Sequence, residues 1–110
     1  MNTRQILNEI KQIDGFLKNH KEYLTNDKYT KYNTTLNELG VKAKLKYIEN
    51  NLINSLSLKS DKEYLKARNL LKKSYKDIKR LEDEMINLKN QINNELNSVK
   101  DICYLAKTLQ

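Results

Sequence analysis

The chain has 110 residues, a formal net charge of +7, two glycines, one cysteine and no proline. One cysteine excludes a disulfide framework, and the near absence of Gly and Pro argues against β-rich folds, whose turns depend on them. No apolar run approaches the roughly 18 residues that a membrane span needs, and the first residues lack a secretory apolar region. We therefore expect a reduced, cytoplasmic protein with no membrane partner.

The first apolar pattern predicts a helix over 3–24. Apolar residues recur there at steps of four and three, which keeps them on one helix face. The stripe consists of Ile6, Ile10, Ile13, Leu17, His20 and Leu24. The cluster Thr25-Asn26-Asp27 then predicts a turn and a helix cap.

Two shorter stripes follow on either side of Gly40, and the phase of the pattern changes between them. The first comprises Tyr29, Tyr32, Leu36 and Leu39. The second comprises Val41, Leu45, Ile48, Leu52 and Leu56. A left-handed glycine ends many helices, so we predict separate helices over 27–39 and 42–57. A single kinked helix that tolerates Gly40 is the alternative.

The strongest signal is an unbroken heptad over 61–109, which begins at a capping box formed by Ser60 and Glu63. Its a positions are Tyr64, Leu71, Ile78, Met85, Ile92, Val99 and Ala106. Its d positions are Ala67, Ser74, Leu81, Leu88, Glu95, Ile102 and Leu109. A helix of this length runs roughly 70 Å and is typical of coiled-coil packing. The fold class is therefore all-α, a single domain built as a helical bundle or hairpin with one long C-terminal helix.

Two arrangements can cover this long apolar seam. Two copies of the chain can pair through it, or the earlier helices can fold back along it. We predict that the earlier helices cover its first half and that 85–109 serves as a dimerisation coil. The predicted self-association seam is Met85, Leu88, Ile92, Val99, Ile102, Ala106 and Leu109. Glu95 interrupts it, either by pairing with a lysine of a partner helix or by reaching solvent.

The residues that usually carry chemistry are scarce. His20 is the single histidine and Cys103 the single cysteine, and both fall among apolar positions. Neither has a neighbouring residue that would complete a metal-ligand set or a nucleophile–base pair. We therefore predict a protein that is not an enzyme and uses no cofactor or metal.

Cations are the candidate contact residues for nucleic acid or for an acidic partner. They are Lys42, Lys44, Lys46, Lys66, Arg68, Lys72, Lys73, Lys76, Lys79 and Arg80. The segment 39–50 resembles the turn and recognition helix of phage-repressor-type helix-turn-helix proteins, with Leu-Gly-Val at 39–41 and Ile-Glu-Asn at 48–50. That resemblance implies phosphate contacts by its three lysines at the start of the second helix.

We predict a non-enzymatic helical module that works by protein–protein contact and forms a homodimer. A small, lysine-rich chain with few motifs is typical of phage or plasmid accessory proteins, so one specific hypothesis is an adaptor or inhibitor of a larger host protein. The alternative is a dimeric nucleic-acid-binding protein that uses a basic helix face or the degenerate helix-turn-helix near 36–50.

Overall fold

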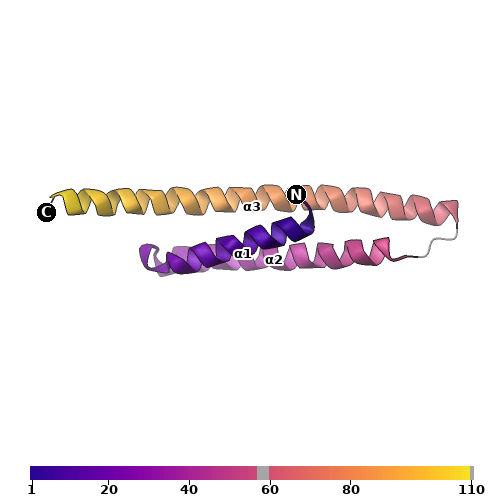
Figure 1. Cartoon of the computed structure of the whole chain (residues 1–110), viewed down its shortest axis with the longest axis horizontal. Coiled ribbons are helices and arrows are strands. Elements are labelled where there is room, and N and C mark those ends of the chain that lie inside the picture. Colours follow the sequence, from indigo (N-terminus) through magenta and orange to yellow (C-terminus); the bar gives the residue numbers. More distant parts are fainter. Residues whose placement is uncertain (57–59, 110) are drawn as a thin grey trace.

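The computed structural model describes residues 1–56 and 60–109, with side chains as far as residue 99. It contains three α-helices, α1 (Thr3–Asn19), α2 (Asn26–Asn54) and α3 (Asp61–Leu109), and one 3-10 turn at Lys21–Tyr23. The helices α1 and α2 lie side by side along α3, and the resulting rod measures 75 × 19 × 16 Å between Cα atoms (Figure 1). The predicted all-α class with a long C-terminal helix is confirmed.

Helix α1 begins at residue 3 as predicted, but it ends at Asn19, before the predicted residue 24, and local hydrogen bonds close both of its ends. At its start, Asn2 Oδ1 accepts from the backbone N–H of Gln5 at 2.9 Å, and Gln5 Oε1 accepts from the Asn2 N–H at 3.0 Å. At its end, His20 Nδ1 donates to the Phe16 carbonyl at 2.8 Å. The chain then enters the 3-10 turn, so the helix ends about one turn before residue 24.

Helix α2 runs straight through Gly40, so the prediction of two helices over 27–39 and 42–57 is wrong. Neither glycine of the chain has a positive φ, and Gly40 therefore makes no left-handed helix end. The predicted end at residue 57 lies outside the described residues. A single helix is favoured because Leu36 and Ala43, on either side of Gly40, are both buried in one core.

Replacing Gly40 with alanine tests the continuous helix. An added Cβ would stand 3.8 Å from Ile10 Cγ2, which is ordinary van der Waals contact. Alanine is about 1 kcal/mol better than glycine inside a helix, so Gly40→Ala is expected to raise the free energy of unfolding by about that amount. Urea denaturation measures the change. A loss of stability would instead indicate a left-handed turn at this position.

The core lies where all three helices meet. It contains the α1 stripe predicted from sequence, the first half of α2 and the middle of α3. Its buried members are Ile6, Ile10, Ile13, Leu17, Leu36, Leu39, Ala43, Ile78, Leu81, Met85, Leu88, Ile92 and Leu96. Burial of these aliphatic side chains is the main stabilising contribution to a bundle of this size.

This core corrects the predicted self-association seam. Met85, Leu88 and Ile92 are at most 5% exposed, because α1 and α2 of the same chain cover them. They are therefore not free to contact a second copy. Val99 is half-buried. The side chains of Ile102, Ala106 and Leu109 lie outside the described residues, so self-association through that end stays a prediction.

Glu95 occupies its core position by bonding to α2. Its carboxylate accepts a hydrogen bond from the Tyr32 hydroxyl and forms a salt bridge with Lys28, while the side chain is only 15% exposed. One of the two predicted roles was pairing with a lysine of a partner helix, and the lysine in the structure is Lys28 of α2 in the same chain. The pair fixes the register of α2 along α3.

The hydroxyl of Tyr32 should make the stability of the protein vary with pH in the alkaline range. Burial, followed by the hydrogen bond to Glu95 and the charge of that carboxylate, raises the pKa of Tyr32 from 10.0 to about 12. A raised pKa stabilises the fold fully below pH 10.0, and that contribution is lost as the pH rises toward 12. We expect the wild type to lose more stability than Tyr32→Phe over this interval, measured by urea denaturation at each pH. Parallel losses would contradict the assignment.

Candidate interaction surface

One end of the rod is built from two helices instead of three. The N-terminal ammonium group of Met1 pairs with Glu82 at 3.0 Å, which places the start of α1 beside the middle of α3. Beyond that point α2 and α3 continue alone, as Figure 1 shows on the side of the connecting loop. We call residues 45–56 and 60–80 the two-helix end.

The contact between α2 and α3 in the two-helix end contains polar side chains beside the buried Ile53 and Ala67. Asn50 Oδ1 accepts a hydrogen bond from Ser74 Oγ at 2.6 Å, and Ser74 is 1% exposed. Lys46 Nζ lies 2.8 Å from Asp77 and 3.1 Å from Glu49. The hydrogen bond to Asp77 is the main cause that raises the pKa of Lys46, and the same bond lowers the pKa of Asp77. Polar side chains of α2 thus face α3 in the two-helix end. In the core, the corresponding positions of α2 hold aliphatic side chains.

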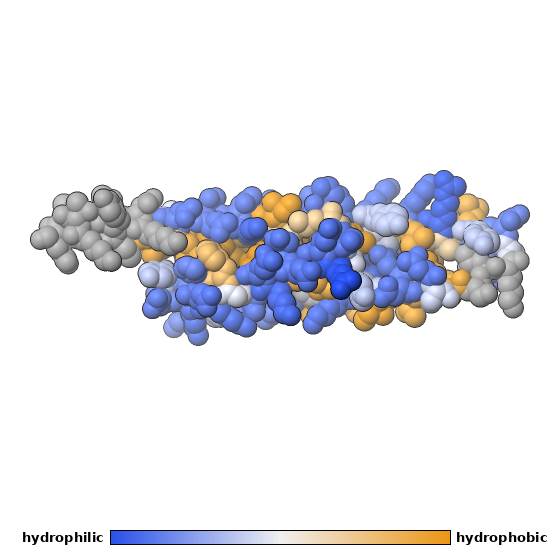
Figure 2. Space-filling model, in the orientation of Figure 1, coloured by the Kyte–Doolittle hydropathy of each residue, from blue (hydrophilic) through white to orange (hydrophobic). Residues whose placement is uncertain are grey.

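From Val41 onward most aliphatic residues of this segment lie instead on the outer face, whereas Ile53 is buried. We call Val41, Leu45, Ile48, Leu52 and Leu56 the outer stripe. All five are between 53% and 62% exposed. Figure 2 shows apolar surface along the lower edge of the rod in this region, over α2. Contiguous exposed apolar surface of this kind marks interaction sites more often than isolated exposed residues do.

Apolar surface also faces an open cleft between the last turn of α2 and the first turns of α3. The cleft has a volume of about 580 Å³. It is lined by Ile53, Asn54, Leu56, Tyr64, Ala67, Arg68, Leu71, Lys72 and Tyr75. Tyr64 and Tyr75 are 61% and 63% exposed, although Tyr64 was predicted to start the packed seam of α3. The seam is open here because α1 does not reach this end.

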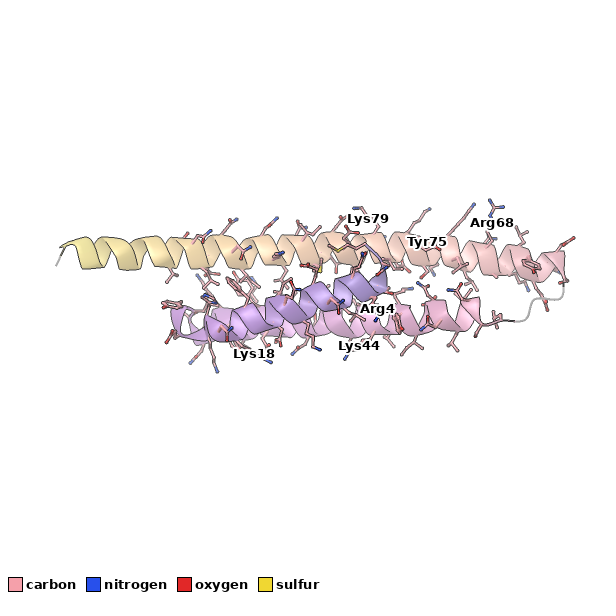
Figure 3. The ribbon with its side chains drawn as sticks, in the orientation of Figure 1. Arg4, Lys18, Lys44, Arg68, Tyr75 and Lys79 are labelled. Carbon is pink, nitrogen blue, oxygen red and sulfur yellow. The ribbon has the colours of Figure 1, made fainter. Side chains whose placement is uncertain are left out.

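Most of the predicted contact cations lie free on the surface of the two helices. Two do not, because Lys46 is held by Asp77 and Glu49, and Lys79 lies 3.3 Å from Asp83. The other eight make no ion pair within the part of the chain that the structure describes. They are Lys42, Lys44, Lys66, Arg68, Lys72, Lys73, Lys76 and Arg80. Figure 3 shows Arg68 and Lys79 directed away from α2, and Lys44 directed away from α3 on the other side of the rod.

The positive charge of the protein is concentrated in the same half. Residues 41–80 hold 12 Lys and Arg side chains and four Asp and Glu, a net charge of +8. The remaining 70 residues therefore carry a net charge of −1. The exposed apolar surface and the positive field of the molecule coincide at one end.

The helix-turn-helix interpretation of 36–50 is wrong. This segment lies inside the continuous helix α2, so there is no turn and no separate recognition helix. The three lysines assigned to phosphate contacts do not share one surface either. Lys46 is drawn into the contact with α3, whereas Lys42 and Lys44 are exposed.

Sequence reasoning identified the residues of the outer stripe but not their exposure. The sequence did contain a signal for this exposure, because α2 carries, besides the outer stripe, a second line of residues at steps of three and four on another face. That line consists of Leu36, Leu39, Ala43, Lys46, Asn50 and Ile53. It faces α3, and the helix therefore has apolar residues on two faces, only one of which the fold uses.

Among the residues that the structure describes, no three His, Cys, Asp or Glu side chains are arranged to hold a metal ion. Across residues 1–56 and 60–109, no helix combines the length and apolar character needed to cross a lipid bilayer. Comparison of the chain with family models, curated proteins and solved structures finds no match.

Proposed function

We propose that this protein is a non-enzymatic module that binds another protein through the outer stripe at its two-helix end. The observation that carries the proposal is the placement of five aliphatic side chains in solvent while polar residues fill the adjacent helix contact. Burying half-exposed aliphatic side chains is the common driving force of protein association. The sequence-based hypothesis of a cytoplasmic phage or plasmid accessory protein that docks on a larger host protein remains compatible with this role.

Affinity capture with matched variants tests the proposal. The full chain and the variant Leu45→Glu/Leu52→Glu are immobilised in parallel, and circular dichroism verifies that both are helical. The variant alters only side chains that are 61% and 62% exposed, so its fold should persist. A stoichiometric partner retained by the wild type and lost by the variant supports the proposal. Identical sets of bound proteins would contradict it.

Nucleic acid is the second candidate partner, favoured by the net charge of +8 in residues 41–80. Lysine-rich surfaces bind the phosphate backbone without sequence preference, and such binding weakens steeply with salt. A gel-shift experiment on duplex DNA at two salt concentrations tests it. Binding that collapses at the higher salt and is reduced by Lys66→Glu/Lys76→Glu supports this candidate. The absence of any shift at low salt eliminates it.

Self-association is proposed for the C-terminal end of α3 alone. The backbone of this helix continues past the turn that joins α1 and α2, as Figure 1 shows at the yellow end. The sequence places Val99, Ile102, Ala106 and Leu109 at heptad positions there. Light scattering should give twice the monomer mass of 13.0 kDa for the wild type and the monomer mass for Ile102→Glu. A concentration-independent wild-type monomer would exclude the dimer.

A further inference from the structure

The outer stripe has the dimensions of a helix-binding seam. Its first four members follow one another at steps of four, three and four residues, which places them in a narrow line along one face of α2, and Leu56 comes two residues after the helix ends. From residue 41 to residue 52 the line is about 16 Å long at 1.5 Å per residue. Apolar anchors at these steps are the pattern by which one amphipathic helix packs along another.

Positive charges border the stripe on both sides. Lys42 lines a surface depression together with Leu45 and Arg80 of α3. Lys44 lines the groove that Val41 shares with α1. Both lysines are exposed and make no ion pair within the described residues. In paired helices, the residues that flank the apolar seam select partners of opposite charge.

Acidic side chains also lie on the Lys42 side of the stripe: Glu49, Asp77 and Glu84 line the same depression, and Glu38 is exposed one turn before Lys42. The carboxylate of Glu49 lies 3.1 Å from Lys46, which is itself bound to Asp77. Its charge is therefore already engaged inside the two-helix end. An approaching helix meets an aliphatic line with the ammonium groups of Lys42 and Lys44 on either side, and with the exposed carboxylate of Glu84 on the Lys42 side.

The alternatives fit this surface less well. A second copy of the chain would bring two segments of net charge +8 together, which like-charge repulsion opposes. Nucleic acid would gain nothing from five exposed aliphatic side chains. Helices that lie on membranes separate one apolar face from one polar face, whereas α2 carries apolar residues on two faces.

We propose that the outer stripe binds an acidic amphipathic helix of a partner protein. The aliphatic side chains of that helix pack along the stripe, and its Asp or Glu residues lie next to Lys42 and Lys44. This inference rests on the proposed function and adds the chemistry of the partner. In the complex, the bound helix packs on the face of α2 that lies away from α3.

Two synthetic helical peptides test the inference. Both consist of four heptads with Leu at a and d, and they differ only in carrying Glu or Lys at e and g. Binding to the full-length protein is measured by fluorescence anisotropy at two salt concentrations. We expect the Glu peptide to bind more tightly than the Lys peptide by about 100-fold or more, with the difference shrinking at high salt.

Variants assign the binding to this surface. Leu45→Glu/Leu52→Glu should weaken the Glu peptide at least about tenfold, since central apolar anchors dominate helix interfaces. Lys42→Glu/Lys44→Glu should reverse the preference between the two peptides. The control Lys66→Glu/Lys76→Glu makes the same change in net charge on α3, and it should leave the preference as it is. Circular dichroism and urea denaturation verify that each variant is folded.

Each other outcome overturns the inference. Equal binding of the two peptides would show that charge does not select the partner. An equal effect of both charge variants would show that the net charge of the protein matters and not the lysines beside the stripe. Binding to anionic lipid vesicles, or self-association by light scattering, that is lost in Leu45→Glu/Leu52→Glu would assign the stripe to a membrane or to a second copy. If neither peptide binds but the capture experiment yields a stripe-dependent partner, the inference fails and the proposed function survives.

Discussion

Leu36→Ala is expected to lower the free energy of unfolding by about 2–5 kcal/mol. This side chain is 1% exposed in the core shared by the three helices, and removing it leaves a cavity that close-packed neighbours fill only in part. A loss of this size is a large fraction of the stability of a small domain. Urea denaturation monitored by circular dichroism measures it.

The matched control lies on the same helix. Leu45→Ala makes the same chemical change at a side chain that is 61% exposed, so we expect a change within about 0.5 kcal/mol. The two variants therefore compare the buried face and the exposed face of α2 by the same type of substitution. Equal losses at both positions would mean that the outer stripe is packed against something within the chain.

Glu95→Ala is expected to lower the free energy of unfolding by about 1.5–3 kcal/mol, the range for hydrogen bonds to charged groups. The substitution leaves the Tyr32 hydroxyl without its acceptor and Lys28 without its counter-charge. Glu84→Ala provides the control, because it removes an exposed carboxylate from the same helix and should have an effect within about 0.5 kcal/mol. Similar losses in both variants would contradict a register role for Glu95.

The pH dependence of the Glu95 contribution has a defined sign. Burial opposes ionisation of this carboxyl, but the hydrogen bonds from Lys28 and Tyr32 outweigh it, and the pKa of Glu95 lies below its ordinary value of 4.5. A lowered pKa stabilises the fold above that value, and the contribution disappears as the pH falls through the folded-state pKa. The stability difference between wild type and Glu95→Ala should therefore shrink on acidification from neutral pH.

The long helix α3 is the element that the sequence predicted best. Its heptad, and the Ser60 hydroxyl that accepts from the Glu63 N–H at 3.2 Å, are local features that neighbouring residues determine. The buried stripe of α1 belongs to the same class, because its steps of three and four set one face without reference to the rest of the chain.

Two interpretations failed where a local signal was ambiguous. Gly40 is compatible both with a helix end and with a helix interior, and the shared core on either side of it decided for the interior. Met85, Leu88 and Ile92 form a seam that suits a second copy or a folded-back helix equally well. Only the position of α1 and α2 showed which of these covers them.

The sequence by itself determined that the chain is helical, where its charge is concentrated, and which residues are apolar. It did not determine which apolar face of α2 is buried, because periodicity defines faces but not their neighbours. The tertiary structure decided this through the length of α1, which covers the first half of α2 and the middle of α3 and leaves the other end of the α2–α3 pair without a third helix. The outer stripe is exposed for that reason, and it is the surface on which the proposed function rests.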